Sequence, residues 1–308
     1  MNIIKQKTLP VQRCGFVTVI GRTNVGKSTL INYILGKKIS ITSRRPHTTR
    51  NKILGVKTEG NTQIIYVDTP GMHLMKKYKN YELNFIMNRT AFRAINDVDC
   101  IIFIIDRLRW TEEDNLILNK INNISVPVIA AVNKIDWIKE KLSLLPWFET
   151  LYKKYKFVAI LPISGKTGLG INKLESVLAN YIPYSKYFFP KDQSTDKNNI
   201  FLSSEIIREK VIRYIGDELP YQITVVIDDY KISQNIIYIN ALIVVERKAQ
   251  KKIIIGAKGI MIKRIGRDAR LDLERLLSAK VILKLWVKIK RSWYNDKQVL
   301  NKLGYDVN

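Results

Sequence analysis

The residues with the clearest chemical potential form the segment GRTNVGKS at positions 21–28. It follows the β-branched run FVTVI, opens the helical pattern TLINYIL, and fits the spacing G-x-x-x-x-G-K-S/T. Glycines let a backbone turn tightly and aim N–H groups at phosphates, and a helix N-terminus adds partial positive charge. We therefore predict a phosphate-binding loop made of Gly21, Arg22, Thr23, Asn24, Val25, Gly26, Lys27 and Ser28.

Lys27 and Ser28 have separate expected roles in this loop. The lysine would reach the β and γ phosphates, and the serine hydroxyl would ligate Mg²⁺. A carboxylate that can hold the same ion through water ends the run TQIIYVD, and the glycine after it can sense the γ phosphate through its amide. The second part of the predicted nucleotide site is therefore Asp68, Thr69, Pro70, Gly71 and Met72.

The segment SRRPHTTRNK at positions 43–52 lies between these two motifs. A threonine in it must supply the second protein ligand to Mg²⁺ when a triphosphate is bound. Thr49 is the first choice, and Thr48 is the close alternative. The predicted metal ligands are thus Ser28, Thr49 and Asp68, and the residues expected to act in catalysis are Lys27, Thr49 and Gly71.

The base would be recognised by the segment NKID, which follows the run VPVIAAV. An aspartate there can accept hydrogen bonds from N1–H and N2–H₂ of guanine, which adenine does not present, so the motif favours GTP and GDP over ATP. The asparagine would brace neighbouring loops, and the lysine would lie along the base. A later triplet, SGK after FVAILPI, could present a backbone N–H to guanine O6. The predicted base site is Asn133, Lys134, Ile135, Asp136, Ser164, Gly165 and Lys166.

Hydrolysis of the bound nucleotide should be slow, because Met72 stands where Ras-like proteins have a glutamine that orients the attacking water. An apolar side chain leaves that task to backbone groups, a cation or a partner. Asn24 is a candidate ligand for K⁺, which would add positive charge beside the phosphates. A turn-forming asparagine explains the same residue equally well, and the sequence leaves both interpretations open.

The first 182 residues show the pattern of a scaffold that can position these motifs. Short β-branched runs at 16–20, 51–57, 62–68, 100–105, 126–132 and 157–163 alternate with helical patterns at 29–35, 80–95, 112–121, 139–155 and 171–181. This alternation predicts an α/β domain, at 1–182, with a mostly parallel six-stranded sheet covered on both faces. The short connection KTEGNT predicts one antiparallel hairpin.

The composition changes at 183–199, where prolines, small polar residues and charges show no periodicity and indicate a linker. Beyond it we expect a helix from positions 203–204 to about 216, strands at 223–227 and 236–245, two helical segments split at 256–259, and a last strand at 281–289. This order predicts a second, smaller α+β domain at 200–308.

A G-x-x-G link joins the two helical segments of this second domain. Such a link lets the backbone approach a phosphodiester, as in KH modules, which clamp about four nucleotides of RNA. The predicted RNA-binding residues are Lys251, Lys252, Gly256, Ala257, Lys258, Gly259, Lys263 and Arg264. The last strand carries Lys284, Trp286 and Lys288 on one face, and the sequence leaves open whether that face meets RNA or solvent.

The net charge of +25 on 308 residues also points to a polyanionic partner. Residues 246–291 hold 15 basic and 4 acidic side chains, a concentration that a general composition bias does not explain. No apolar run approaches the roughly 18–20 residues of a membrane span, and the N-terminal residues lack the apolar core of a signal peptide. Two cysteines cannot build a disulfide framework. We therefore expect a cytoplasmic protein.

Taken in order, GRTNVGKS, the TTR loop, DTPG, NKID and SGK resemble the Era family of translation-factor-related GTPases. The likeness continues through KISITSR, SSEIIREK, ELPY and AQKKIIIGAKG, and so covers the whole chain. One departure is Gly165, where the family commonly has alanine; because that contact uses the backbone, we expect little loss.

This resemblance implies a GTPase domain followed by a type II KH domain, with GTP/GDP and Mg²⁺ as cofactors and K⁺ as a further candidate. It also implies a monomer that binds 16S rRNA and acts in assembly of the small (30S) ribosomal subunit and in 16S rRNA 3′-end maturation. Peripheral association with an anionic inner membrane is expected alongside. The alternative is a signalling GTPase whose second domain docks on protein or membrane, a role that needs no G-x-x-G link.

Overall fold

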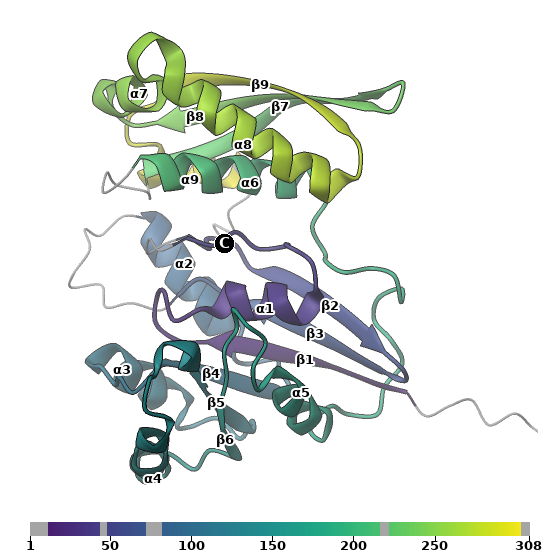
Figure 1. The fold of residues 1–308 in the computed structure, drawn as a ribbon, viewed down its shortest axis with the longest axis vertical. Coiled ribbons are helices and arrows are strands. Elements are labelled where there is room, and N and C mark those ends of the chain that lie inside the picture. Colours follow the sequence, from purple (N-terminus) through teal and green to yellow (C-terminus); the bar gives the residue numbers. More distant parts are fainter. Residues whose placement is uncertain (1–11, 44–47, 72–81, 216–221, 303–308) are drawn as a thin grey trace, which may run out of the picture.

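A computed structural model describes residues 12–43, 48–71, 82–215 and 222–302 of the chain. Met72 and the segment ELPY at 218–221 lie outside the described residues, as do the remaining residues of 1–11, 44–47, 72–81, 216–221 and 303–308. Within the described part, none of the helices combines the length and the apolar character that a membrane span requires. The structure consists of a larger lower layer and a smaller upper one (Figure 1).

The larger layer is built on a six-stranded sheet whose strand order is β2-β3-β1-β4-β5-β6. Only the β2–β3 pair is antiparallel, so the predicted hairpin and the mostly parallel sheet are both confirmed. The strands are β1 (Arg13–Ile20), β2 (Ile53–Glu59), β3 (Thr62–Asp68), β4 (Cys100–Asp106), β5 (Val128–Asn133) and β6 (Ala159–Pro162).

Helices cover both faces of this sheet, as its buried strands require. α1 (Lys27–Leu35) and α5 (Ile171–Ala179) enclose one core with the sheet. The second core lies under α2 (Glu82–Arg93), α3 (Glu112–Ile121) and α4 (Leu144–Lys154). α3 begins with a capping box, in which Asp114 accepts hydrogen bonds from the backbone and hydroxyl of Thr111.

The helix predicted over 139–155 is shorter than expected. The chain first forms the 3₁₀ turns η2 (Ile135–Trp137) and η3 (Lys141–Ser143), and α4 begins only at Leu144. Pro146 explains the late start, because proline is tolerated in the first turn of a helix and not in its interior.

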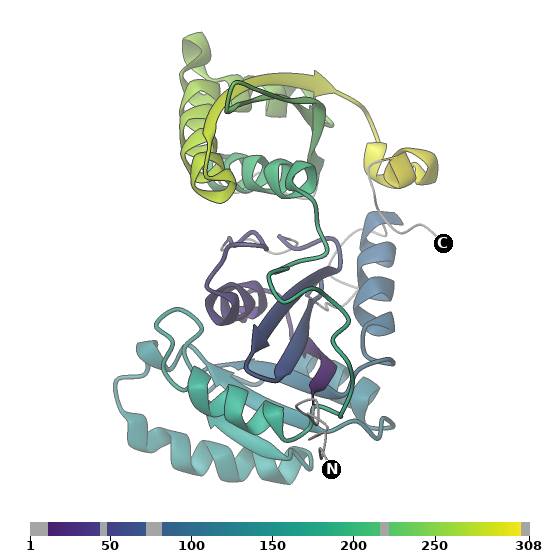
Figure 2. The same cartoon turned by 90° about the vertical axis from the view of Figure 1, so that its right-hand side faces the viewer.

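The smaller layer is the predicted α+β domain. It contains α6 (Asn199–Tyr214), β7 (Ile223–Ser233), β8 (Ile236–Val245), α7 (Lys248–Ile255), η5 (Ala257–Gly259), α8 (Ile260–Leu277) and β9 (Lys280–Ile289). The sheet order is β7-β8-β9, with β7 antiparallel and β9 parallel to β8. The helices α6, α7 and α8 pack on one face of it and bury a separate core (Figures 1 and 2).

Two element boundaries in this domain differ from the prediction. α6 starts at Asn199, since the side chain of Asn198 caps it by accepting a hydrogen bond of 2.9 Å from the Phe201 N–H. β7 continues past Ile227 through an irregularity in register before Asp229. Asp228 and Asp229 interrupt the hydrophobic pattern there, so the sequence does not predict the second part of the strand.

The C-terminal residues form two elements that the sequence pattern does not predict. They are η6 (Trp293–Asn295) and α9 (Lys297–Lys302). Trp293 is completely buried in a cluster that contains Leu83, Ile86 and Met87 of α2 and Val244 of β8. The C-terminal segment therefore lies between the two layers and ties the second domain to α2 (Figure 2).

Residues 183–199, expected to be a linker, are hydrogen-bonded along the larger sheet. The buried side chain of Gln63 accepts hydrogen bonds of 3.0 Å from the N–H groups of Phe188 and Phe189. Further on, Val56 N–H donates to the Ser194 carbonyl at 2.9 Å and Thr195 forms a bridge with Gly55 of β2. This segment, which we call the strap, is thus attached to the first domain over most of its length.

Candidate functional site

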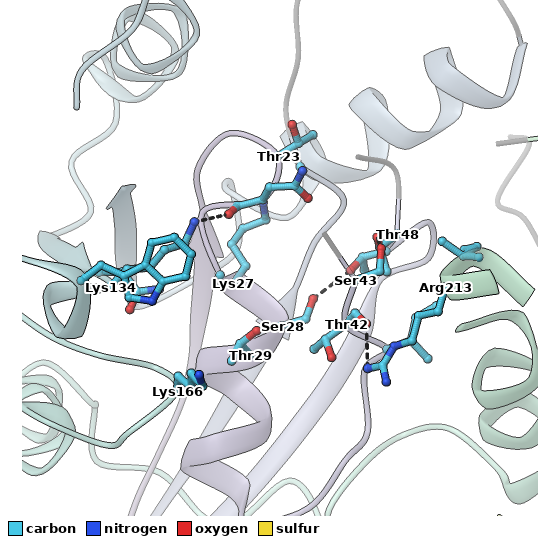
Figure 3. A pocket seen from close by; sticks show the side chains of 18 of the residues that line it. Thr23, Lys27, Ser28, Thr29, Thr42, Ser43, Thr48, Lys134, Lys166 and Arg213 are labelled. Atoms are coloured by element: carbon cyan, nitrogen blue, oxygen red, sulfur yellow. Dashed lines mark hydrogen bonds between the residues drawn. The ribbon is translucent and has the colours of Figure 1, made fainter. Parts of the chain in front are cut away.

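The predicted nucleotide-binding residues surround one cavity of about 850 Å³ (Figure 3). It lies at the carboxyl ends of the parallel strands, where ligands bind in open α/β sheets. Its wall includes Thr23, Asn24, Gly26, Lys27, Ser28, Thr49, Gly71, Asn133, Lys134, Asp136 and Lys166, all of them predicted from sequence. The separate motifs therefore converge at a single place.

Lys27 lies at the centre of the phosphate-binding loop, with its ammonium donating to the carbonyls of Gly21 at 3.0 Å and Arg22 at 2.9 Å. The Asp-Thr-Pro-Gly segment comes close from the other side: a Cβ built on Gly71 would lie 3.1 Å from Lys27 Nζ. The same Cβ would lie 2.9 Å from the Thr23 Cα, so a larger residue at this position would force the backbone to shift. Burial lowers the pKa of Lys27 to about 8, although the charge of Asp68 partly opposes the shift.

Nucleotide binding is expected to take up a proton at Lys27 above neutral pH. Phosphate oxygens around the ammonium would raise its pKa again, because opposite charge favours the charged form. The affinity for GDP should therefore be highest below the free protein's pKa of about 8 and fall as the pH rises through it. Titration calorimetry in two buffers of different ionisation enthalpy, about one unit above this pKa, should show uptake approaching one proton. No uptake there, or equal uptake about one unit below, would contradict the buried-amine environment.

Of the three predicted metal ligands, Ser28 lies within hydrogen-bonding distance of both others. Ser28 Oγ donates to Asp68 Oδ2 at 2.7 Å and lies 2.8 Å from Thr49 Oγ1. The neighbouring Thr48 hydroxyl instead lies 2.7 Å from Ser43 Oγ, so the geometry favours Thr49 as the ligand. Two hydroxyls and a carboxylate form the oxygen donor set that suits Mg²⁺. Burial raises the pKa of Asp68, and hydrogen bonds such as that from Ser28 oppose this shift.

Asn133 connects the loops around the base site. Its Nδ2 donates to the Val25 carbonyl at 2.8 Å, and its Oδ1 accepts from Gly165 N–H at 2.9 Å. Gly26, with φ of 107°, leaves room for this brace, because a Cβ there would lie 2.4 Å from Asn133 Nδ2. Gly165 packs closely on α1, where a Cβ would lie 3.2 Å from the Leu30 backbone.

Two side chains of the NKID segment are held in position to contact a base. Asp136 is exposed in the cavity wall, and its Oδ1 accepts a hydrogen bond of 2.8 Å from Ser164 Oγ. Lys134 Nζ donates to the Asn24 carbonyl at 2.7 Å and pairs with Asp106 at 3.3 Å, so its side chain is held in the cavity wall beside the phosphate-binding loop (Figure 3). The Asp136 carboxylate can still accept hydrogen bonds from a group in the cavity, as guanine recognition requires.

Some predicted residues do not line the cavity. Arg22 is the clearest case, since its guanidinium pairs with Asp114 at 3.3 Å and Asp106 at 3.7 Å and ties the loop to α3. The Arg22 side chain therefore points away from the cavity wall, although the Arg22 carbonyl accepts a hydrogen bond from Lys27. The other described residues outside the wall support its members or are buried in the domain: Gly21, Val25, Asp68, Thr69, Pro70, Ile135, Ser164 and Gly165.

Sequence reasoning missed several residues of the wall, and two of them belong to the second domain. Arg213 of α6 reaches the cavity beside Thr42, donates to its carbonyl at 3.3 Å, and pairs with Glu209 at 2.6 Å (Figure 3). No local pattern could reveal this, because the contact depends on how the domains pack. The unpredicted members are Thr29, Ile41, Thr42, Ser43, Trp137, Ile212 and Arg213.

The predicted RNA-binding residues surround the turn between α7 and α8. Gly256 and Gly259 have φ of 72° and 75°, and Lys258 between them also has a positive φ, of 48°. The turn is therefore sharply bent with its backbone near the surface, and Ala257 and Lys258 are exposed at its tip. Lys252, Lys263 and Arg264 are exposed on the adjoining helices, and Lys251 is half-buried.

The outward face of β9 matches the predicted alternation. Lys284 and Lys288 are exposed, and Trp286 between them has 49% of its surface accessible. Across the described residues, no group of three or more histidine, cysteine, aspartate or glutamate side chains could hold a metal ion.

Two family models match the chain: "50S ribosome-binding GTPase" at residues 16–134 and "KH domain" at residues 218–294. GTPase Era of Pseudomonas aeruginosa (strain LESB58) is 52% identical over 293 residues, which cover 95% of each chain. GTPase Era of Pseudomonas putida (strain W619) is also 52% identical over 293 residues, covering 95% of this chain and 97% of that one.

Two solved structures are similar over nearly the whole chain. Era in complex with MgGDPNP and nucleotides 1506–1542 of 16S ribosomal RNA is 37% identical, with a TM-score of 0.91 over 96% of this chain and 99% of that one. A tyrosine-to-alanine variant of Aquifex aeolicus Era bound to GDP and AlF₄⁻ is 36% identical, with a TM-score of 0.90 and the same coverage.

Proposed function

The chain belongs to the Era family of GTPases, and from this premise we propose that its GTPase cycle serves assembly of the small ribosomal subunit. In this proposal the KH domain holds the 3′ segment of 16S rRNA while that end of the RNA matures. The observation that carries it is the presence, in one chain, of a guanine-nucleotide cavity and an exposed G-x-x-G turn with basic flanks. The similarity to an Era protein solved with a 16S rRNA segment supports it.

The nucleotide chemistry rests on residues already described. Mg²⁺, when bound, would neutralise charge on the β and γ phosphates, and Ser28, Thr49 and Asp68 would hold it. Lys27 would contact the same phosphates, and Gly71, which lines the same cavity, would offer its backbone N–H to the γ phosphate. Asp136 would select guanine. The residue that follows Gly71 in the sequence is Met72, which has no group that could orient water, and this supports a slow intrinsic rate.

We propose K⁺ as an additional cofactor beside Asn24. Asn24 lines the cavity next to the phosphate-binding loop lysine, where a monovalent cation would add positive charge during hydrolysis. Its φ of 63° also suits a turn-forming asparagine, so the geometry is compatible with both of its possible roles.

The small subunit is favoured over the large one, although one family model carries the description "50S ribosome-binding GTPase". That model covers only the nucleotide-binding half, which many GTPases share. The solved Era complex instead aligns with 96% of this chain, KH domain included, and contains RNA of the small subunit. The extent of the alignment therefore supports 16S rRNA and the 30S subunit as partners.

We also propose a cytoplasmic, monomeric protein with peripheral association to an anionic inner membrane. The net charge of +25 and the basic residues of 246–291 support the membrane association, because they suit anionic lipid as well as RNA.

Binding to 16S rRNA and cation-dependent hydrolysis test this function together. The full chain should bind an RNA of the 16S 3′ end with salt-sensitive affinity, and bind a scrambled RNA of equal length more weakly. GTP hydrolysis should be slow alone, faster with the cognate RNA, and faster in K⁺ than in Na⁺ buffer. Equal affinity for both RNAs would refute the ribosomal role, and equal rates in the two salts would refute only the K⁺ site. Crosslinking in cells, with sequencing of the bound RNA, would identify the natural partner.

A further inference from the structure

The loop between α1 and β2 carries the predicted magnesium ligand Thr49 and is attached to the second domain on both sides of it. We call its described residues, 36–43 and 48–52, the α1–β2 loop. Thr49 is nearly buried, and its hydroxyl lies 2.8 Å from that of Ser28. The residues immediately before and after it each contact the second domain, so contacts from outside its own domain also hold Thr49 in position.

The contact before Thr49 is made by Arg208 of α6. Its Nη2 donates to the Thr48 carbonyl at 2.5 Å and to Glu205 Oε2 at 2.5 Å, and its Nε donates to Glu205 Oε1 at 2.7 Å. The Arg208 side chain is 1% exposed. A guanidinium that makes two hydrogen bonds to one carboxylate has little conformational freedom, so its other N–H donors point in a fixed direction. That direction is toward the backbone next to Thr49.

The contact after Thr49 is made by Arg50. Its Nη1 donates to the Ile223 carbonyl at the start of β7 at 2.8 Å, and its guanidinium lies 5.9 Å from the centre of the Trp293 ring. Arg50 is 2% exposed. Both neighbours of Thr49 are therefore anchored in the second domain through buried, charged hydrogen bonds, which are costly to break singly.

A third attachment lies earlier in the same loop. Glu209, next to Arg208 on α6, is fully buried and accepts hydrogen bonds from Lys38 Nζ at 2.9 Å and from the Thr42 N–H at 3.2 Å. Consecutive residues of α6 thus hold both ends of the loop.

We propose that Arg208 is a positioning residue for the magnesium-bound triphosphate state, acting through the Thr48 carbonyl on Thr49. This rests on the proposed role of Thr49 as a ligand that binds Mg²⁺ only with a triphosphate. The KH domain then completes the GTP site, and the diphosphate site does not need it. Any RNA-induced shift of α6 would reach the metal ligand through this contact.

The test compares the affinities of Arg208→Lys and Arg208→Ala for fluorescent GDP and for a non-hydrolysable GTP analogue over a range of Mg²⁺ concentrations. The lysine variant keeps a charge for Glu205 but lacks the fork that reaches Thr48, so its fold should be retained. We expect affinity for the GTP analogue to fall about tenfold or more, the size of a lost charged hydrogen bond, with GDP affinity unchanged. The Mg²⁺ concentration needed to retain the analogue should rise in parallel.

The matched control is Arg270→Ala on α8, whose side chain pairs only with Glu274 at 3.4 Å in the described structure. It should leave both affinities unchanged. Equal weakening of GDP and analogue in the Arg208→Lys variant, or no weakening of either, would overturn the proposal. Thr49→Ala tests the role of Thr49 separately from that of Arg208. If this variant too leaves the ratio of GDP affinity to analogue affinity unchanged, the ligand assignment of Thr49 fails. If Thr49→Ala alone changes the ratio, the assignment stands and the role of Arg208 fails.

Discussion

Replacing Asp136 by asparagine is expected to lower the affinity for GTP by about a thousandfold or more and to make xanthosine triphosphate the preferred nucleotide. The Asp136 carboxylate is exposed in the cavity wall and is held by Ser164 at 2.8 Å. It can accept the two N–H groups that guanine presents on one edge. An amide places a donor where one of these acceptors stood, which opposes guanine N2–H₂ and suits the carbonyl of xanthine.

The measurement is a competition titration of GTP, xanthosine triphosphate and ATP against one fluorescent nucleotide for each protein. Asp192→Asn is the matched control, because Asp192 is exposed in the strap, away from the cavity wall. It should bind like the wild type. Unchanged GTP affinity in the Asp136→Asn variant would mean that another residue reads the base.

Replacing Gly259 by aspartate is expected to weaken binding of the 16S rRNA 3′ segment by about ten- to a hundredfold while leaving GTP affinity unchanged. Gly259 has φ of 75°, and a Cβ there would meet only Ile262, at 4.0 Å. Aspartate tolerates such backbone better than most residues, so the turn should survive. Its carboxylate would then stand where the proposal places a phosphodiester, and would repel it.

Filter binding of the RNA at two salt concentrations tests this, with the loss expected to be larger at low salt. Gly60→Asp is a matched control, since Gly60 also has a positive φ, of 57°, and nothing lies within 4 Å of a Cβ there. It sits in the hairpin of the GTPase domain and should leave RNA affinity unchanged. Gly256 is a poor site for the same test, because a Cβ would lie 2.7 Å from Met261 and distort the turn. Full RNA affinity in the Gly259→Asp variant would place the RNA elsewhere on the domain.

The motifs that depend on only a few consecutive residues could be predicted from sequence. The phosphate-binding loop, the Asp-Thr-Pro-Gly segment and NKID each join a strand to a loop, and a parallel sheet brings strand ends together whatever lies between them. The choice between Thr48 and Thr49 could not be made, because adjacent side chains of an extended loop point in different directions and only the packed structure orients them. In the structure one faces Ser43 and the other Ser28.

Contacts between the domains could not be predicted from the sequence, for a different reason. Arg208 and Arg213 appear in the sequence as ordinary charges on an amphipathic helix, and Trp293 follows the last predicted strand in a segment without periodicity. Their roles depend on the docking of surfaces more than 150 residues apart along the chain, as the hydrogen bonds from Arg208 to Thr48 and from Arg213 to Thr42 illustrate. The roles of the assigned site residues stay predictions until the variants are measured.

The strap has a consequence for how the molecule can be divided. β2 is the outermost strand of the six-stranded sheet, and on its outer side Thr195 and its neighbours occupy part of the row of backbone groups that would otherwise be unpaired. An exposed strand edge invites pairing with another chain. A fragment cut at residue 182 would bare this edge and become a template for self-association, whereas one that ends after Asp196 would carry its own cover. The segment that connects the domains thus also covers part of the sheet edge.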